Sequence, residues 1–270
     1  MVNASTSWKW MFILWYLIFI FIFPILSLLK GVQKVSFFKF FEIAFQPIAV
    51  SAYATTFSSA FFACLCNTVF GLLLAWVLVR YQFPGKRFID SAIDLPFSIP
   101  TSVAGLTLAT VYGPSGWVGQ FLDKFGIQIV FTWFGVVLAM IFVSFPFMVR
   151  TLQPVLEEIE KESEEAAFSL GASPWQVFWT IVFPSIVPAL LTGMTLAFSR
   201  AIGEYGSVVV VSANIPFQDL IASVLIFQKL EQYDTIGAAI IGTVILFFSL
   251  FLLLGINGFQ SWHKRQQKPT

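Results

Sequence analysis

The chain has 270 residues, of which 58% are hydrophobic and 11% are charged, and its formal net charge is +1. Soluble domains carry about 25% charged residues, so this composition excludes an ordinary water-soluble domain and predicts one long membrane domain. A net charge so close to zero also provides no global field that would attract nucleic acid or an acidic partner. Cys64 and Cys66 lie in an apolar run, where we expect small buried side chains rather than a metal or redox site.

Six segments have the roughly 20 mostly apolar residues that a helix needs to cross a bilayer. They are Trp10–Leu29, Tyr53–Val79, Ser91–Tyr112, Phe131–Val149, Ile186–Val211 and Ile236–Asn257. We therefore predict an all-α integral membrane protein with six transmembrane helices, the first a retained span rather than a signal or transit peptide. The third contains Asp94, Pro96 and Pro100, so we expect it to pack inside the protein, where neighbours satisfy freed carbonyl groups.

The basic residues near the span ends predict cytoplasmic termini, because nine would lie on the cytoplasmic side and five on the other. The cytoplasmic nine are Lys9, Arg80, Lys86, Arg87, Arg150, Lys161, Lys264, Arg265 and Lys268; the external five are Lys30, Lys34, Lys39, Lys124 and Lys229. Among the external segments, the aromatic-rich Ser36–Phe45 is either a helix at the membrane interface or an ordinary loop. Ala109–Gly119 is rich in turn-forming residues and predicts a tight turn.

Between the fourth and fifth predicted spans lies a polar cytoplasmic segment, ESEEAAFSLGASPWQVFWTIVFP. Glu and Ala favour a helix, and Ala166-Ala167 would leave one patch of that helix flat enough for another surface to approach closely. Gly171 stands where a left-handed residue ends a helix, and Ser173-Pro174 is typical of the start of the next one. These signals predict two short helices joined at a glycine; a solvated charged loop is the alternative.

The same residues resemble a known motif. Glu165-Ala166-Ala167, Gly171, Ile181 and then Phe183-Pro184 resemble the EAA motif of ATP-binding cassette (ABC) importer permeases, with Phe183 where the motif usually has leucine. The resemblance implies a coupling helix that docks on a separate ATP-binding subunit. It assigns this role to Glu165, Ala166, Ala167, Gly171, Ile181 and Pro184. No G-x-x-x-x-G-K-[ST] pattern occurs in the sequence, so we expect no catalytic, cofactor or metal site here, and ATP bound by a partner.

The fifth predicted span contains two charges, Arg200 and Glu204, four residues apart. Charges inside a membrane are expensive and often functional, and this spacing lets them pair on one helix face. The pair either fixes helix packing, with Asp90 or Asp94 as further partners, or places Arg200 beside a pathway for a desolvated anion. Thr101, Ser102 and Gly105 follow Pro100 and are weaker pathway candidates, since small residues at helix contacts explain them equally well.

Four further stretches resemble the sulfate/thiosulfate permeases of the CysT type: LPFSIPTSVAGLTL, YGPSGWVG, FTWFGVVLAMIFVSFPFMVRTLQPVL and SRAIGEYGSVV. The resemblance implies a permease domain at 51–258, preceded by a first helix and external segment at 1–50 and followed by a cytoplasmic tail at 259–270. It also implies an ATP-binding subunit of the CysA type, a second permease subunit (a CysW-type sister or a second copy) and a possible external sulfate-binding protein.

Two other functions stay open at this point. Molybdate and tungstate permeases share part of the pattern and would work as homodimers, whereas an ion-coupled secondary transporter could use Asp94, Arg200 and Glu204 as a relay but has no need of an EAA loop. The 33 phenylalanines reflect a bias typical of AT-rich genomes. Plastid genomes are AT-rich, and the permeases that this chain resembles include plastid-encoded ones. The resemblance therefore implies a multi-pass protein of the plastid inner envelope, with the bacterial cytoplasmic membrane as the alternative.

Overall fold

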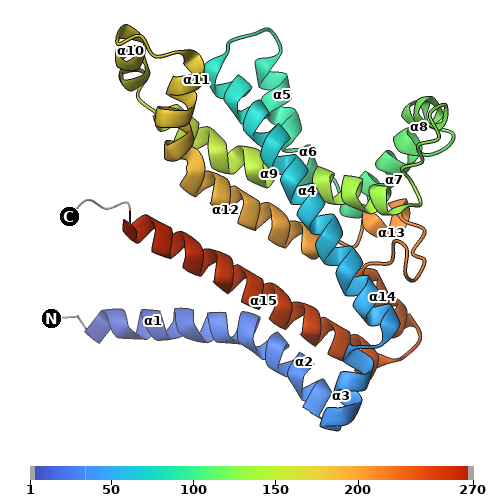
Figure 1. Cartoon of the computed structure of the whole chain (residues 1–270). Coiled ribbons are helices and arrows are strands. Elements are labelled where there is room, and N and C mark those ends of the chain that lie inside the picture. Colours follow the sequence, from blue (N-terminus) through green and yellow to red (C-terminus); the bar gives the residue numbers. More distant parts are fainter. Residues whose placement is uncertain (1–3, 34, 267–270) are drawn as a thin grey trace.

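The structure, a computed structural model, describes residues 4–33 and 35–266, and helices are the only regular elements over those residues (Figure 1). They are α1 (Ala4–Leu17), η1 (Ile18–Ile22), α2 (Phe23–Gln33), α3 (Phe37–Ala44), α4 (Pro47–Arg80), α5 (Lys86–Ile93), α6 (Leu95–Ser98), α7 (Thr101–Tyr112), α8 (Trp117–Asp123), α9 (Trp133–Glu158), α10 (Lys161–Ser169), α11 (Pro174–Val177), η2 (Phe178–Val182), α12 (Phe183–Ile202), α13 (Val208–Val211), α14 (Ala222–Glu231) and α15 (Thr235–Gln266). The prediction of an all-α protein is confirmed.

Five helices within the described residues are long and apolar enough to cross a membrane, rather than the six predicted. They are Trp10–Gln33, Pro47–Arg80, Trp133–Glu158, Pro174–Ile202 and Thr235–Ile256. The polar segment that carries α10 therefore lies between the third and fourth of these helices. The five helices cover most of the predicted first, second, fourth, fifth and sixth spans, so the difference in count comes from the third.

The prediction of a continuous third span over Ser91–Tyr112 is wrong. The chain forms α5, α6 and α7 there, and Ile99 adopts an extended backbone (φ −92°, ψ 131°) directly before Pro100. A residue before proline is pushed away from the helical region by the proline ring, which separates α6 from α7. With its 12 residues, α7 is about 18 Å long, too short to cross the hydrocarbon core alone.

The predicted fifth span also differs, because α12 ends at Ile202 and does not continue to Val211. A glycine-containing turn at 203–206 follows and leads into the short helix α13. In this turn the carboxylate of Glu204 accepts hydrogen bonds from the N–H and the hydroxyl group of Ser207, both at 2.9 Å. This local alternative to helical hydrogen bonding explains why an apolar run stops being a helix here.

The centre of the protein is formed by α4, α9 and α12, each of which packs against the other two (Figure 1). Small residues allow the close approach: a Cβ atom built at Gly71 would lie 2.6 Å from Cγ of Met148, and one at Gly193 would lie 2.9 Å from its Sδ. Met148 of α9 is fully buried between α4, which carries Gly71, and α12, which carries Gly193. On the outside, α15 packs against α12 and α14, and α2 packs against α15.

The beginning of α1, the end of α15 and the helix α10 all lie toward the same end of the bundle, whereas α3, α8 and α14 lie toward the other (Figure 1). The start of α1, the end of α15 and α10 thus share one end of the bundle, and the side of the membrane that this end faces stays a prediction. Ser36 begins α3 as its N-cap, so the segment is helical; its place at a membrane interface stays a prediction. Met1–Asn3, Lys34 and Lys268, which the predictions include, lie outside the described residues.

Candidate coupling segment and translocation site

The polar segment forms two short helices joined at Gly171, as predicted. Gly171 has a φ of +88°, and its N–H donates to the carbonyl oxygen of Phe168 at 2.9 Å, while the N–H of Ala172 donates to that of Ala167 at 3.0 Å. These two hydrogen bonds form a Schellman motif, which requires a left-handed residue and so favours glycine. Gly171 therefore ends α10 in one defined direction, and we call the turn at 170–173 the elbow.

Two reciprocal hydrogen bonds fix the start of the second helix, α11. The Ser173 hydroxyl accepts from the N–H of Gln176, and the Gln176 side chain accepts from the N–H of Ser173 at 2.8 Å, a capping box. The helix then widens to the π-turn η2, in which the N–H of Phe183 donates to the carbonyl oxygen of Phe178. Pro184 has no N–H for the usual bond to Thr180, and this missing donor accounts for the wider turn. The second short helix, α11, thus continues through η2 directly into α12.

The segment is anchored to the C-terminal end of α4. Arg80, the last residue of α4, forms an ion pair with Glu164 of α10, and both side chains are largely buried, with 14% and 16% exposed. The guanidinium also lies 5.1 Å from the ring of Trp76, at a distance that suits a cation–π contact. Trp76 in turn packs edge-on against Phe178 at 5.8 Å between ring centroids. One end of α4 therefore contacts α10 and the start of η2, which continues α11.

Several apolar side chains of the segment remain exposed. Leu170 is 90% exposed beside the elbow, and Trp175 on α11 is 69% exposed. Of the residues that the resemblance assigns to coupling, Glu165, Ala166, Gly171 and Pro184 lie on the surface, whereas Ala167 and Ile181 are partly buried. The segment thus offers small and large apolar groups together at one end of the molecule, the kind of patch that marks an interaction site.

Arg200 and Glu204 form the ion pair that their spacing predicts. Nη1 of Arg200 lies 2.7 Å from Oε2 of Glu204, whose side chain is 2% exposed, whereas that of Arg200 is 31% exposed. The other oxygen of Glu204 accepts the two hydrogen bonds from Ser207, and the backbone carbonyl of Glu204 accepts from the hydroxyl group of Ser223 at 2.6 Å. Both oxygens of the buried carboxylate are therefore paired, while the Arg200 side chain stays partly exposed.

The first turns of α7 pack against the turn that follows α12. A Cβ atom built at Gly105 would lie 2.6 Å from the carbonyl oxygen of Ser207, and a Cβ at Gly206 would collide with the side chain of Thr101. The structure thus brings Thr101 and Gly105 together with the Glu204–Ser207 turn, although they are about 100 positions away in the sequence. Ser102 is exposed beside them.

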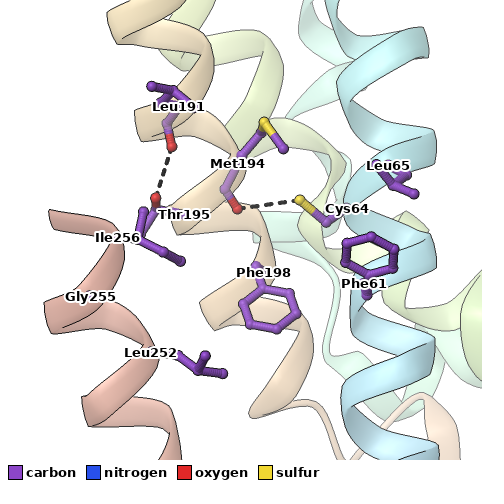
Figure 2. A pocket seen from close by; sticks show the side chains of 10 residues that line it. All are labelled: Phe61, Cys64, Leu65, Leu191, Met194, Thr195, Phe198, Leu252, Gly255 and Ile256. Atoms are coloured by element: carbon purple, nitrogen blue, oxygen red, sulfur yellow. Dashed lines mark hydrogen bonds between the residues drawn. The ribbon is translucent and has the colours of Figure 1, made fainter. Parts of the chain in front are cut away.

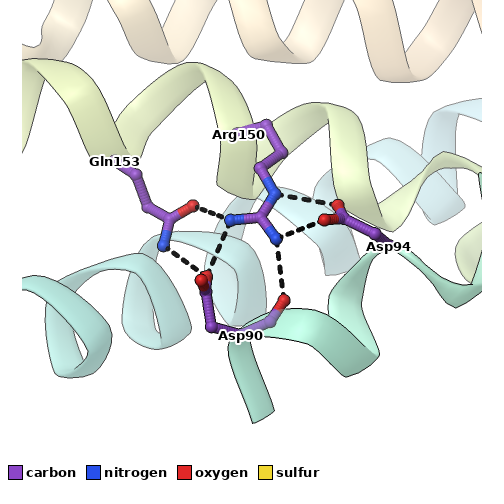
Figure 3. Close-up of polar contacts among 4 residues, drawn as sticks. All are labelled: Asp90, Asp94, Arg150 and Gln153. Atoms are coloured by element: carbon purple, nitrogen blue, oxygen red, sulfur yellow. Dashed lines mark hydrogen bonds and ion pairs between the residues drawn. The ribbon is translucent and has the colours of Figure 1, made fainter. Parts of the chain in front are cut away.

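The prediction that Asp90 or Asp94 partners Arg200 is wrong: both bind Arg150 of α9 (Figure 3). Arg150 Nη1 lies 2.7 Å from Asp90, and Nη2 lies 2.6 Å from Asp94. Hydrogen bonds from Gln153 and Arg150 to the Asp90 carboxylate lower its pKa from the ordinary value. These contacts tie α5 and the start of α6 to α9, and Arg200 lies on a different helix.

Comparison with known proteins identifies the family to which this chain belongs. Residues 67–265 match the family described as "Binding-protein-dependent transport system inner membrane component". The chain belongs to this family of ABC importer permeases. It is 62% identical over 259 residues to a protein of Chlorokybus atmophyticus described as "Probable sulfate transport system permease protein cysT", covering 96% of this chain and 91% of the relative. It is 54% identical over 259 residues to "Sulfate transport system permease protein CysT" of Synechococcus elongatus, covering 96% and 93%.

Solved structures share the fold. The chain superposes with a TM-score of 0.76 on a subunit of a bacterial ABC transporter that imports alginate, at 20% identity, covering 98% of this chain and 96% of that one. An amino acid ABC transporter gives a TM-score of 0.57 at 18% identity, covering 86% and 99%. As a permease, the chain is a multi-pass membrane subunit for transport, and ATP hydrolysis belongs to a partner subunit.

A separate apolar cavity of about 440 Å³ lies between α4, α12 and α15 of this permease (Figure 2). Its few polar groups bond within the protein: the thiol of Cys64 contacts the carbonyl oxygen of Met194 at 3.5 Å, and the hydroxyl group of Thr195 donates to that of Leu191 at 2.8 Å. A desolvated oxyanion needs donors that point into its site. The cavity is therefore no candidate for the translocation site.

Sequence reasoning missed the polar contacts that join distant helices. From the sequence, Arg150 and Arg80 contribute only to the prediction of membrane orientation, and their ion-pair partners are not predicted. Asn67 of α4 is fully buried and donates to the Ser144 hydroxyl of α9 at 2.8 Å. The signal for Asn67 was present, because an isolated amide in an apolar span must find a partner, but the sequence does not say which one.

Proposed function

We propose that this chain is the permease subunit of an ATP-driven sulfate/thiosulfate importer. The observation that carries the proposal is the 62% identity over 96% of the chain to a protein described as a sulfate transport system permease. The local resemblance to CysT-type permeases in four separate stretches, from Leu95 to Val209, supports the same substrate.

In this proposal the α10–elbow–α11 segment is the coupling segment, which docks on the ATP-binding subunit and carries its movement into α12. The small face at Ala166 and the exposed Leu170 and Trp175 support a docking surface. The Schellman motif at Gly171 and the capping box at Ser173 support a stiff connection, since both restrict the backbone. Glu165, Ala167, Ile181 and Pro184 complete the assigned set.

For the translocation pathway we propose the region where α7 meets the turn after α12. A guanidinium has five N–H donors, and the ion pair with Glu204 engages Nη1 of Arg200, so other donors of this partly exposed group are positioned to contact an oxyanion. The hydroxyl groups of Thr101 and Ser102 lie at the adjacent helix start. Glu204 neutralises Arg200, which lets an anion pass without being held as tightly as by a free cation.

The proposal includes partners and location. They are an ATP-binding subunit of the CysA type, a second permease subunit of the CysW type or a second copy of this chain, and an external sulfate-binding protein. The bacterial alginate transporter, one of the structures with this fold, forms a complex with a periplasmic protein. Within the chain, 51–258 would be the permease domain, after the first helix and external segment at 1–50 and before the tail at 259–270. The plastid inner envelope is the proposed location, with the bacterial cytoplasmic membrane as the alternative.

Uptake of radiolabelled sulfate in a sulfate-permease-deficient bacterium tests the function. The chain is expressed with its ATP-binding subunit and sister permease, and unlabelled thiosulfate or molybdate is added as competitor. We expect ATP-dependent uptake that thiosulfate blocks and molybdate does not. Block by molybdate would assign the chain to molybdate transport instead, and no uptake by a fully assembled complex would refute sulfate as the substrate. Omission of the second permease in a parallel culture distinguishes a heterodimer from a homodimer.

A further inference from the structure

We propose that Arg150 is a positioning residue that joins the coupling segment to α7 and so to the pathway region. The inference rests on the proposed function, which assigns coupling to the segment that begins at α10. It adds a mechanical connection that the coupling segment itself does not contain. Arg150 lies on α9, eight residues before the end of that helix at Glu158, and α10 begins at Lys161.

The guanidinium of Arg150 uses all five of its N–H donors (Figure 3). Nε and Nη2 bind the two oxygens of Asp94 at 2.8 and 2.6 Å, Nη1 binds the Asp90 carboxylate and the Gln153 side chain at 2.7 Å, and Nη2 also binds the Asp90 carbonyl at 2.7 Å. The Gln153 amide closes the cluster by donating to Asp90 at 3.0 Å. Such a bidentate, saturated arrangement fixes orientation as well as distance.

The cluster holds the element that leads into α7. Asp90 lies on α5 and Asp94 ends it, and Leu95 begins α6 at once. Two residues then separate α6 from α7, so α6 has little freedom to move without α7. A contact between Phe97 of α6 and Phe147 of α9, with ring centroids 5.2 Å apart, holds the same pair of elements one helical turn from Arg150.

The other end of this connection is the close packing of α7 against the turn after α12. Gly105 contacts the backbone of Ser207, and Ser207 binds the Glu204 carboxylate that pairs with Arg200. A movement of α9 that starts at the coupling segment is thus passed through Arg150 and α6 to α7 and then to Arg200. Without the cluster, only apolar contacts such as Phe97–Phe147 would join α9 to α5 and α6, and these can slide more easily than directed hydrogen bonds.

The charges of the cluster point to orientation rather than to stability as its role. The side chains of Arg150, Asp90 and Asp94 are 32%, 43% and 46% exposed, and ion pairs that water reaches contribute little to folding. Lysine has the same charge but presents no planar fork for two carboxylates. The substitution Arg150→Lys therefore separates the effect of charge from that of geometry.

The test is the number of ATP molecules hydrolysed per sulfate transported by the assembled transporter in proteoliposomes. We expect Arg150→Gln to raise this ratio roughly 2- to 30-fold, the range in which residues along a coupling connection act, and Arg150→Lys to raise it less. A residue that only stabilised the fold would lower both rates together and leave the ratio unchanged. Arg87→Gln is the matched control. Arg87 is exposed on α5, the helix that carries Asp90, and takes part in no ion pair among the described residues.

An unchanged ratio for assembled Arg150→Gln would overturn the inference. If that variant does not assemble, Asp94→Asn decides, because it keeps the side-chain shape and removes one bidentate partner; an unchanged ratio there overturns the inference equally. The proposed function fails separately, if the unaltered chain moves no sulfate while its assembled partner hydrolyses ATP.

Discussion

The elbow at Gly171 allows a quantitative test of the coupling assignment. Its φ of +88° lies in the left-handed region, where an L-residue costs about 1–2 kcal/mol. Nothing lies within 4 Å of a Cβ built at Gly171, so a substitution meets no steric obstacle and its cost comes from the backbone alone. A cost of this size reduces the population of the elbow conformation roughly 5- to 30-fold.

Three substitutions separate the causes. Asparagine tolerates a left-handed backbone better than most residues, so Gly171→Asn is expected to reduce sulfate uptake least. Gly171→Val, with a β-branched side chain, is expected to reduce uptake by the factor above. Gly171→Pro also removes the N–H that bonds to Phe168 and forces a negative φ, so it is expected to uncouple ATP hydrolysis from transport while the protein stays in the membrane.

The assay is ATP-driven sulfate uptake and ATP hydrolysis by the same proteoliposomes, normalised to assembled complex. Gly126→Val is the control, because Gly126 also has a positive φ (+70°) and open space around a built Cβ but lies outside the coupling segment. Unchanged uptake by assembled Gly171→Val, or an equal loss in Gly126→Val, would refute the reasoning that the elbow geometry transmits the movement.

Three further predictions concern other contacts. Arg80→Gln leaves the largely buried Glu164 unpaired and is expected to make α10 more sensitive to limited proteolysis, with Arg80→Lys restoring part of the protection; equal sensitivity of all three proteins would contradict the anchoring of α10. Gly71→Ala forces a contact with Met148 and is expected to destabilise the protein by about 1–3 kcal/mol, seen as a lower Tm in detergent. In a Met148→Ala background the same change is expected to lower the Tm less, because the contact is absent there; an unchanged Tm for Gly71→Ala alone would show that the two helices separate at little cost. Asp90 has a lowered pKa in the folded protein, so its contribution to stability, which is small because 43% of the side chain is exposed, is present above its unfolded value of about 3.9 and is lost as the pH falls through the lower folded value. Thermal unfolding between pH 3 and 7 is therefore expected to show a smaller acid-induced loss of Tm in Asp90→Asn than in the unaltered protein, and identical pH profiles would exclude this contribution.

Local patterns in the sequence were sufficient for the features whose partners lie within a few residues. The elbow at Gly171 follows from the order of a helix-forming run, a glycine and a Ser-Pro pair, and the structure has it there. The pairing of Arg200 with Glu204 likewise follows from helical periodicity, which places residues four apart on one face. Apolar length alone identified the five long helices.

Tertiary structure decided the contacts between helices and the fate of the third predicted span. Whether Pro96 and Pro100 are tolerated in one helix or divide it depends on what packs around them, and here the chain is divided. Asp90 and Asp94 were candidate partners of Arg200 in the sequence, and only the packing of α5 against α9 pairs them with Arg150. The sequence by itself determined that the chain is a helical membrane protein with a polar segment of two short helices, for which coupling is our proposal. How that segment connects to the pathway region depends on side chains brought together from distant helices, because periodicity defines the faces of a helix but not their partners.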